Sequence, residues 1–176
     1  EQLKGVSRRG SIDKILNWGG LSISETEIED LMHKKNIWYL ELMGEMDESE
    51  ILPGVVRILK EAQDLGLKIA LGSASKNAPL TLDQVSLASF FQIIVDGNVV
   101  TTSKPDPEVF IKGAEGIGLA SEECIVFEDS ISGIEAALAG GMKAVGIGHP
   151  DTLYKAHLNL DGFANVELQK DILDRL

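Results

Sequence analysis

The stretch IVFEDSISGIEAA, residues 125–137, places two adjacent acids where an apolar run ends and a helical pattern begins. Residues 125–127 are typical of a buried strand. Two unit charges about 4 Å apart repel by roughly 4 kcal/mol at an effective dielectric constant near 20. Glu128 and Asp129 at a half-buried strand end therefore indicate a nearby cation, and Mg²⁺ suits them because it takes oxygen ligands and keeps several waters. The alternative is an exposed turn in which Asp129 caps the helix.

Strand and helix patterns alternate through most of the chain. Near-continuous apolar strands of this kind are expected when helices cover both faces of a parallel sheet, so the pattern predicts an α/β fold with a doubly wound parallel sheet. Strands are expected at 67–73, 91–96, 124–129 and 143–148, and helices at 55–65, 78–86, 107–116, 131–139 and 166–176.

The first part of the chain carries helical patterns without strands. The clearest helix is expected over 24–43, where Ser24 and Glu27 predict a capping box. A shorter helix is expected over 11–18, ending at a pair of glycines. A polar connection, MDESEILPG, follows and reads as a hinge. The expected domains are therefore a helical one with its hinge over 1–50 and an α/β one over 51–176.

Composition narrows the classes of function. The 176 residues are 44% hydrophobic and 25% charged, which is ordinary for a globular protein. A net charge of −12 argues against nucleic acid, which needs a basic face. No apolar stretch is long enough to span a membrane, and no leader typical of secretion opens the chain. The single cysteine, Cys124, lies in a strand-like run and favours a reducing, cytoplasmic location.

Polar residues gather after the predicted strands, where doubly wound sheets bind their ligands. The first strand is followed by SASKN (73–77), the second by TSKPDP (102–107) and the third by EDS (128–130). Taken singly, Ser73 could cap the next helix and Lys104 could be a solvated loop residue. Together these strand ends present a hydroxyl, an ammonium and two carboxylates at one rim, which suits a phosphate group and a metal ion.

The strings SASKN, SKPDP and EDS, with LKGVSR near the start, resemble the haloacid dehalogenase (HAD) superfamily and, within it, the β-phosphoglucomutases. Members transfer phosphoryl groups through an aspartyl phosphate. The resemblance covers roughly residues 1–150 and implies a HAD-like core with a small helical cap, both incomplete at the N-terminus. Superfamily members begin with a strand ending in DxDG, which this chain lacks. We therefore expect a missing segment of roughly 40 residues, whose absence exposes edges in the sheet.

The resemblance implies a role for each matching residue. Ser73 and Lys104 would contact the transferring phosphoryl group, while Asp129 directly and Glu128 through water would hold Mg²⁺. A mutase also needs a site for a second, non-reacting phosphate, which a guanidinium grips well. The residues implied to bind substrate are Lys4, Gly5, Val6, Arg8 and Ser11 from the cap, Lys35 from the long helix, and Ala74, Ser75, Lys76 and Asn77 from the core. Lys35 could instead bury its stem and lift its ammonium to water.

Three functions remain open. The leading prediction is an isomerase that interconverts β-glucose 1-phosphate and glucose 6-phosphate through a bisphosphate intermediate. The second is a HAD phosphatase acting on a small sugar or organic phosphate. The third is an inactive fragment that only binds phosphate ligands or a partner, because the nucleophilic aspartate is absent. The expected partner is a small sugar phosphate, not nucleic acid or a membrane, and the intact protein is expected to be a monomer.

Overall fold

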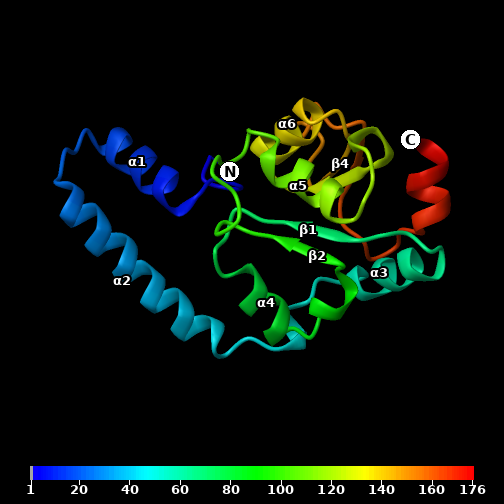
Figure 1. Cartoon of the computed structure of the whole chain (residues 1–176), viewed down its shortest axis with the longest axis horizontal. Helices are drawn as coiled ribbons and strands as arrows, with labels where there is room; N and C mark the ends of the chain where they lie inside the picture. The colour runs from blue at the N-terminus through cyan, green and yellow to red at the C-terminus, as the bar shows by residue number, and fades with distance from the viewer. Residues whose placement is uncertain (1) are drawn as a thin grey trace.

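The computed structural model describes residues 2–176. Two helices come first, α1 (Arg8–Gly19) and α2 (Glu25–Met43), and Figure 1 shows them projecting together to one side of the sheets. The capping box at the start of α2 is confirmed, since the Ser24 hydroxyl accepts from the Glu27 N–H group and the Glu27 carboxylate accepts from the Ser24 N–H group. α1 begins earlier than predicted because Ser7 caps it.

The rest of the chain alternates helices and strands in the predicted order. The elements are η1 (Glu48–Glu50), α3 (Val55–Asp64), β1 (Ala70–Gly72), α4 (Ala78–Gln84), η2 (Ala88–Phe90), β2 (Ile93–Val95), α5 (Glu108–Gly116), η3 (Ser121–Glu123), β3 (Ile125–Glu128), α6 (Ile131–Ala139), β4 (Lys143–Ile147), β5 (Leu158–Leu160), η4 (Leu168–Ile172) and η5 (Leu173–Arg175). A π-helical turn, η4, and a 3₁₀ turn, η5, replace the α-helix predicted over 166–176. The strand β5 was not predicted.

The strands form two parallel sheets, β1-β2 and β3-β4-β5. Ala70 pairs with Ile93 in the first sheet, and Ile125 pairs with Lys143 in the second. Within the described part of the chain no ladder joins β1 to β3, so each of these strands keeps one unpaired edge. The parallel α/β fold is confirmed, with the described strands divided between two sheets.

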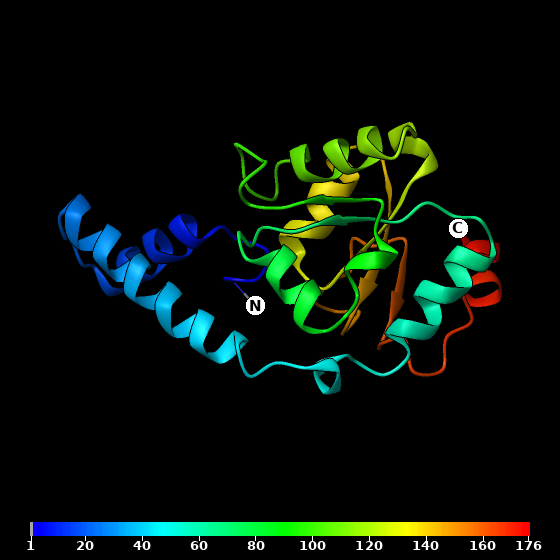
Figure 2. The ribbon, with the colours of Figure 1, turned by 60° about the horizontal axis from the view of Figure 1, so that its bottom comes forward.

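A shared layer of helices holds the two sheets together. α5 packs on β1 and β2, while α6 packs on β3 and β4. One apolar core runs from Val95 of β2 through Phe110 and Ile134 of these helices to Val126 of β3. On the opposite face of β1-β2, Leu82 of α4 packs in a second cluster, and Figure 2 shows α4 and α5 on either side of this pair of strands. The carboxyl ends of β1 and β3 are thereby fixed near one another.

The connection between α2 and α3 is anchored at its core end. Gly54 has φ +88°, and a Cβ atom there would lie 2.0 Å from the carbonyl oxygen of Phe163. Only glycine fits this close approach. The hinge role of this connection stays a prediction. Among the described residues, no helix is both long and apolar enough to cross a membrane.

Candidate active site

Lys104 lies between the ends of the two sheets. Its ammonium forms an ion pair with the carboxylate of Glu128 at the end of β3, and it donates to the carbonyl oxygen of Gly72 at the end of β1, 3.3 Å away. The same nitrogen lies 4.6 Å from the centre of the Phe110 ring. A buried cation thus bridges two strands that share no ladder.

Glu128 is held from several sides. Its carboxylate accepts from the Ser130 hydroxyl at 2.9 Å and from the backbone N–H groups of Asp129 and Ser130 at 3.1 and 3.2 Å. A Cβ atom on Gly133 would lie 2.0 Å from the carboxylate carbon, so only glycine at this helix position leaves room for it. Ser130 caps α6 by accepting from Gly133, and Asp129 does not. The N-terminal end of α6 also favours a negative charge at this place.

Asp129 points to solvent and has a different partner. Its side chain is 64% exposed, and its carboxylate lies 3.6 Å from the Lys4 ammonium. The neighbouring acids are therefore offset by two separate lysines, Lys104 and Lys4. These lysines supply positive charge near both acids, and the role of the two carboxylates in holding a metal ion stays a prediction.

The oxygen donors at this point nevertheless fit Mg²⁺. Asp129 presents an open carboxylate, while Glu128 is occupied by Lys104 and is suited to contact through water. Among residues 2–176 there is no group of three His, Cys, Asp or Glu side chains that could hold a metal. Mg²⁺ accepts such a sparse set, because waters and substrate phosphate oxygens complete its shell.

The loop after β1 is curled by its own hydroxyl groups. Ser73 accepts from the Ser75 N–H group and Ser75 accepts from the Asn77 N–H group, each at 3.1 Å. Gly97 braces the loop from the neighbouring strand, since a Cβ atom there would lie 2.6 Å from the Ala74 carbonyl oxygen. Both serine hydroxyls keep a proton that can be donated to a phosphate oxygen.

Arg8 and Asn77 meet at a residue that was not predicted. The amide oxygen of Asn36, on α2, accepts from the Arg8 guanidinium at 2.5 Å and from the Asn77 side-chain amide at 3.0 Å. One residue from α1 and one from the α/β part of the chain are thus joined through α2. The family resemblance named the neighbouring Lys35 instead, and the only signal for Asn36 was its place beside that lysine.

The segment before α1 approaches α6 closely. The Ser132 hydroxyl donates to the Lys4 carbonyl oxygen at 3.1 Å. Gly5 has φ +70°, and a Cβ atom there would lie 2.6 Å from the Ser132 hydroxyl oxygen and 2.7 Å from that of Ser130. Glycine at this position therefore allows the segment to lie beside Glu128.

Other predicted residues lie at the margin of this arrangement. Lys35 is exposed, with its ammonium 4.8 Å from the ring of Tyr39 one turn along the same helix. Lys76 is also exposed, and its carbonyl oxygen accepts from Asn98. Val6 and Ser11 are half-buried just before and within the first turn of α1. The structure does not join Lys35 to the phosphate-binding candidates.

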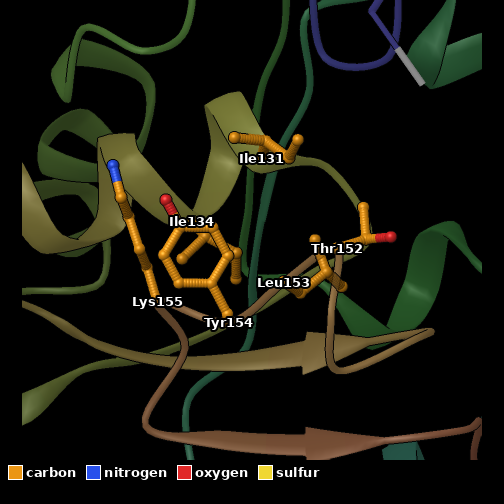
Figure 3. Close-up of a pocket in the computed structure, with 6 residues that line it drawn as sticks. All are labelled: Ile131, Ile134, Thr152, Leu153, Tyr154 and Lys155. Carbon is orange, nitrogen blue, oxygen red and sulfur yellow. The ribbon is translucent and has the colours of Figure 1, made fainter.

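A small pocket lies elsewhere, between α6 and the loop after β4. Figure 3 shows Tyr154 and Lys155 beside Ile134 of α6, with Leu153 and Thr152 further along the wall. Its volume is about 10 Å³, which is room for about one water molecule. A sugar phosphate cannot fit there, so the strand ends remain the candidate site.

Known proteins match this chain in sequence. The model of the haloacid dehalogenase-like hydrolases matches residues 12–147. The chain belongs to the haloacid dehalogenase-like hydrolase family. It is 36% identical over 160 residues to the β-phosphoglucomutase of Bacillus subtilis, covering 90% of this chain and 71% of that protein. It is 34% identical over 125 residues to a phosphorylated carbohydrates phosphatase of Thermotoga maritima, covering 68% and 58% respectively.

The fold of this HAD chain also matches a solved mutase. The crystal structure of a β-phosphoglucomutase from Clostridium difficile superposes with a TM-score of 0.94 at 35% identity, covering 99% of this chain and 78% of that one. The chain is thus a HAD-superfamily enzyme domain of the phosphatase and mutase kind, close to β-phosphoglucomutase.

Proposed function

We propose that the protein containing this chain is a sugar-phosphate mutase that interconverts β-glucose 1-phosphate and glucose 6-phosphate. The observation that carries the proposal is the presence of two separate clusters of hydrogen-bond donors, each of which we propose to bind an anion. Lys104 and Ser73 lie at the strand ends, while Arg8 and Asn77 meet at Asn36 on α2. A bisphosphate intermediate needs two such sets, whereas simple hydrolysis needs one.

At the strand ends, Lys104 would neutralise the oxygens of the transferring phosphoryl group. Its ammonium is preorganised by Glu128 and the Gly72 carbonyl, so it costs little reorganisation during transfer. The Ser73 hydroxyl would donate a hydrogen bond to the same group. Mg²⁺, when held by Asp129 and through water by Glu128, would supply further positive charge to these oxygens.

We place the attacking carboxylate on a segment outside these 176 residues. The sequence has no DxDG motif, and β1 and β3 each keep an unpaired edge beside Lys104. A parallel strand between those edges would complete the sheet and deliver its carboxyl end to the phosphoryl group. This part of the proposal rests on the family resemblance, together with the break between the two sheets.

Arg8 is proposed to bind the non-reacting phosphate when α1 and α2 close over the strand ends. Its planar guanidinium can grip two phosphate oxygens at once. The polar connection at 46–54 would act as the hinge. Closure would exclude water, so that the phosphoryl group passes to a sugar hydroxyl rather than to water.

The alternative is a phosphatase, which the 34% identity to the Thermotoga maritima enzyme favours. The test is to incubate the full-length protein with β-glucose 1-phosphate, Mg²⁺ and a trace of glucose 1,6-bisphosphate. Glucose 6-phosphate and inorganic phosphate are then followed together by ³¹P NMR. Accumulation of glucose 6-phosphate without free phosphate supports the mutase. Stoichiometric release of phosphate would establish the phosphatase. If neither product forms, the protein would be a domain that only binds its ligand.

A further inference from the structure

We propose that Asn36 is a positioning residue that aims Arg8 and Asn77 at one point, where they hold the non-reacting phosphate of a sugar phosphate. This inference rests on the proposed function and deepens it. No sequence motif contains Asn36, and its role is inferred from its contacts in the folded chain alone.

The geometry is that of two donors sharing one acceptor. The amide oxygen of Asn36 receives the Arg8 guanidinium at 2.5 Å and the Asn77 amide at 3.0 Å. A carbonyl oxygen has two lone pairs, so these two bonds saturate it. Because both donors converge on one oxygen, that atom marks a place where an anionic oxygen would find two donors ready.

A ligand can reach this place. Arg8, Asn36 and Asn77 are all half-buried rather than enclosed. Hydrogen bonds to an ionised oxygen are roughly twice as strong as those between neutral groups. A phosphate oxygen therefore competes well against the neutral Asn36 amide for the same donors. Asn36 thus holds both donors toward one place.

This arrangement has a measurable consequence for affinity. Ordering a long side chain on binding costs about two- to tenfold in affinity, and Asn36 orders two of them beforehand. The three residues also come from α1, α2 and the loop before α4, so the bridge fixes the spacing between the two sides of the site. The site should therefore favour a sugar phosphate over inorganic phosphate alone.

The test is isothermal titration of the full-length protein with glucose 6-phosphate, and separately with inorganic phosphate. Asn36→Ala should weaken glucose 6-phosphate binding about tenfold. Inorganic phosphate can also bind at Lys104 and Ser73, which Asn36 does not contact, so its overall binding should change by less than about threefold. Asn36→Asp should weaken the sugar phosphate at least as much, because the new carboxylate pairs with Arg8 and repels the ligand. Asn17→Ala, an exposed asparagine on α1, is the matched control and should bind like the unaltered chain.

A double variant separates positioning from a general structural effect. If Asn36 acts through Arg8 and Asn77, then Asn36→Ala should cost less affinity in the Arg8→Ala background than in the unaltered protein. Losses that multiply would overturn the inference. Circular dichroism should show every variant folded, since alanine and aspartate are both tolerated on a helix surface.

These experiments distinguish failure of the mutase proposal from failure of the role proposed for Asn36. If the unaltered full-length protein binds no glucose 6-phosphate, the mutase proposal and this inference both fall. If the unaltered protein binds and Arg8→Ala weakens binding, while both Asn36 variants bind normally, only the role of Asn36 is overturned.

Discussion

Lys104 and Glu128 form an ion pair in which the two side chains are only 5% and 8% exposed. Burying two charges is costly unless further hydrogen bonds satisfy them. Here the Gly72 carbonyl accepts a further hydrogen bond from the lysine, and the Ser130 hydroxyl donates one to the glutamate. The pair therefore serves the fold, by joining the loop after β2 to β3, and it places a fixed ammonium at the candidate site.

Removing one member of this pair should destabilise the protein strongly. Lys104→Met leaves Glu128 buried without its cation, which should lower the free energy of unfolding by about 3 kcal/mol. Urea denaturation measures the change. Lys155→Met is the control, because its ion pair with Glu135 is 44% and 36% exposed and should contribute less than about 1 kcal/mol. Equal losses for the two variants would contradict the assigned importance of the buried pair.

Gly133 should tolerate no side chain. Gly133→Ala places a Cβ atom 2.0 Å from the Glu128 carboxylate carbon, which Lys104 and Ser130 hold in place, so about 1–3 kcal/mol should be lost. Gly113→Ala in α5 is a matched control, because its Cβ atom would meet only Ala70 at 3.6 Å. That variant should be neutral or gain up to about 1 kcal/mol in thermal unfolding. A neutral Gly133→Ala would show that Glu128 is free to move.

Alanine variants of Gly5 and Gly20 allow the effect of backbone strain to be separated from the effect of a steric clash. Both have positive φ, +70° and +61°, so each alanine variant should cost about 1–2 kcal/mol in backbone strain. Only Gly5→Ala also collides with the hydroxyls of Ser130 and Ser132. Glucose 6-phosphate titration should therefore show weaker binding for Gly5→Ala and unchanged binding for Gly20→Ala. The account fails here if both variants bind alike.

Glu108 should account for part of the decrease in the free energy of unfolding at acidic pH. The Lys112 ammonium and the N–H groups of Thr102 and Thr101 lower the pKa of Glu108 from 4.5 to about 2. Because the folded-state pKa lies below the unfolded one, its contribution is complete above about pH 4.5 and is lost as the pH falls toward 2. Glu108→Gln should therefore lower the free energy of unfolding at pH 7, and the difference from the unaltered chain should shrink between pH 5 and pH 2. A difference that is constant with pH would contradict this assignment.

The alternation of apolar runs and helical periods was enough to predict most of the fold. α6 lies at its predicted bounds, Ile131–Ala139, because Ser130 caps it and glycines follow it. β5 was missed because its three residues, Leu158–Leu160, carry too short a pattern to separate from a loop. The helix predicted at the C-terminal end instead takes π and 3₁₀ turns, in which the Leu168 N–H group donates to Glu61 of α3. Long-range packing decides the conformation of such a segment.

The candidate site was predictable only where a fold rule applied. Carboxyl ends of the strands in a doubly wound parallel sheet lie along one rim, so Lys104 after the second predicted strand and Glu128 at the end of the third were expected on the same side of the fold. Their direct pairing did not follow, and it replaced part of the charge assigned to a metal ion. Asn36 could not be foreseen, since its partners Arg8 and Asn77 lie 28 and 41 residues away and depend on how α2 rests against the loop before α4.

The most direct test of the central claim is the location of sugar-phosphate binding. Backbone ¹⁵N NMR of the full-length protein, titrated with glucose 6-phosphate in the presence of Mg²⁺, reports this residue by residue. The account predicts that the amide signals of Arg8, Ser75, Asn77, Lys104 and Asp129 shift together and saturate at one ligand concentration. Shifts confined to the small pocket around Tyr154, or shifts in only one of the two sets of groups, would contradict it.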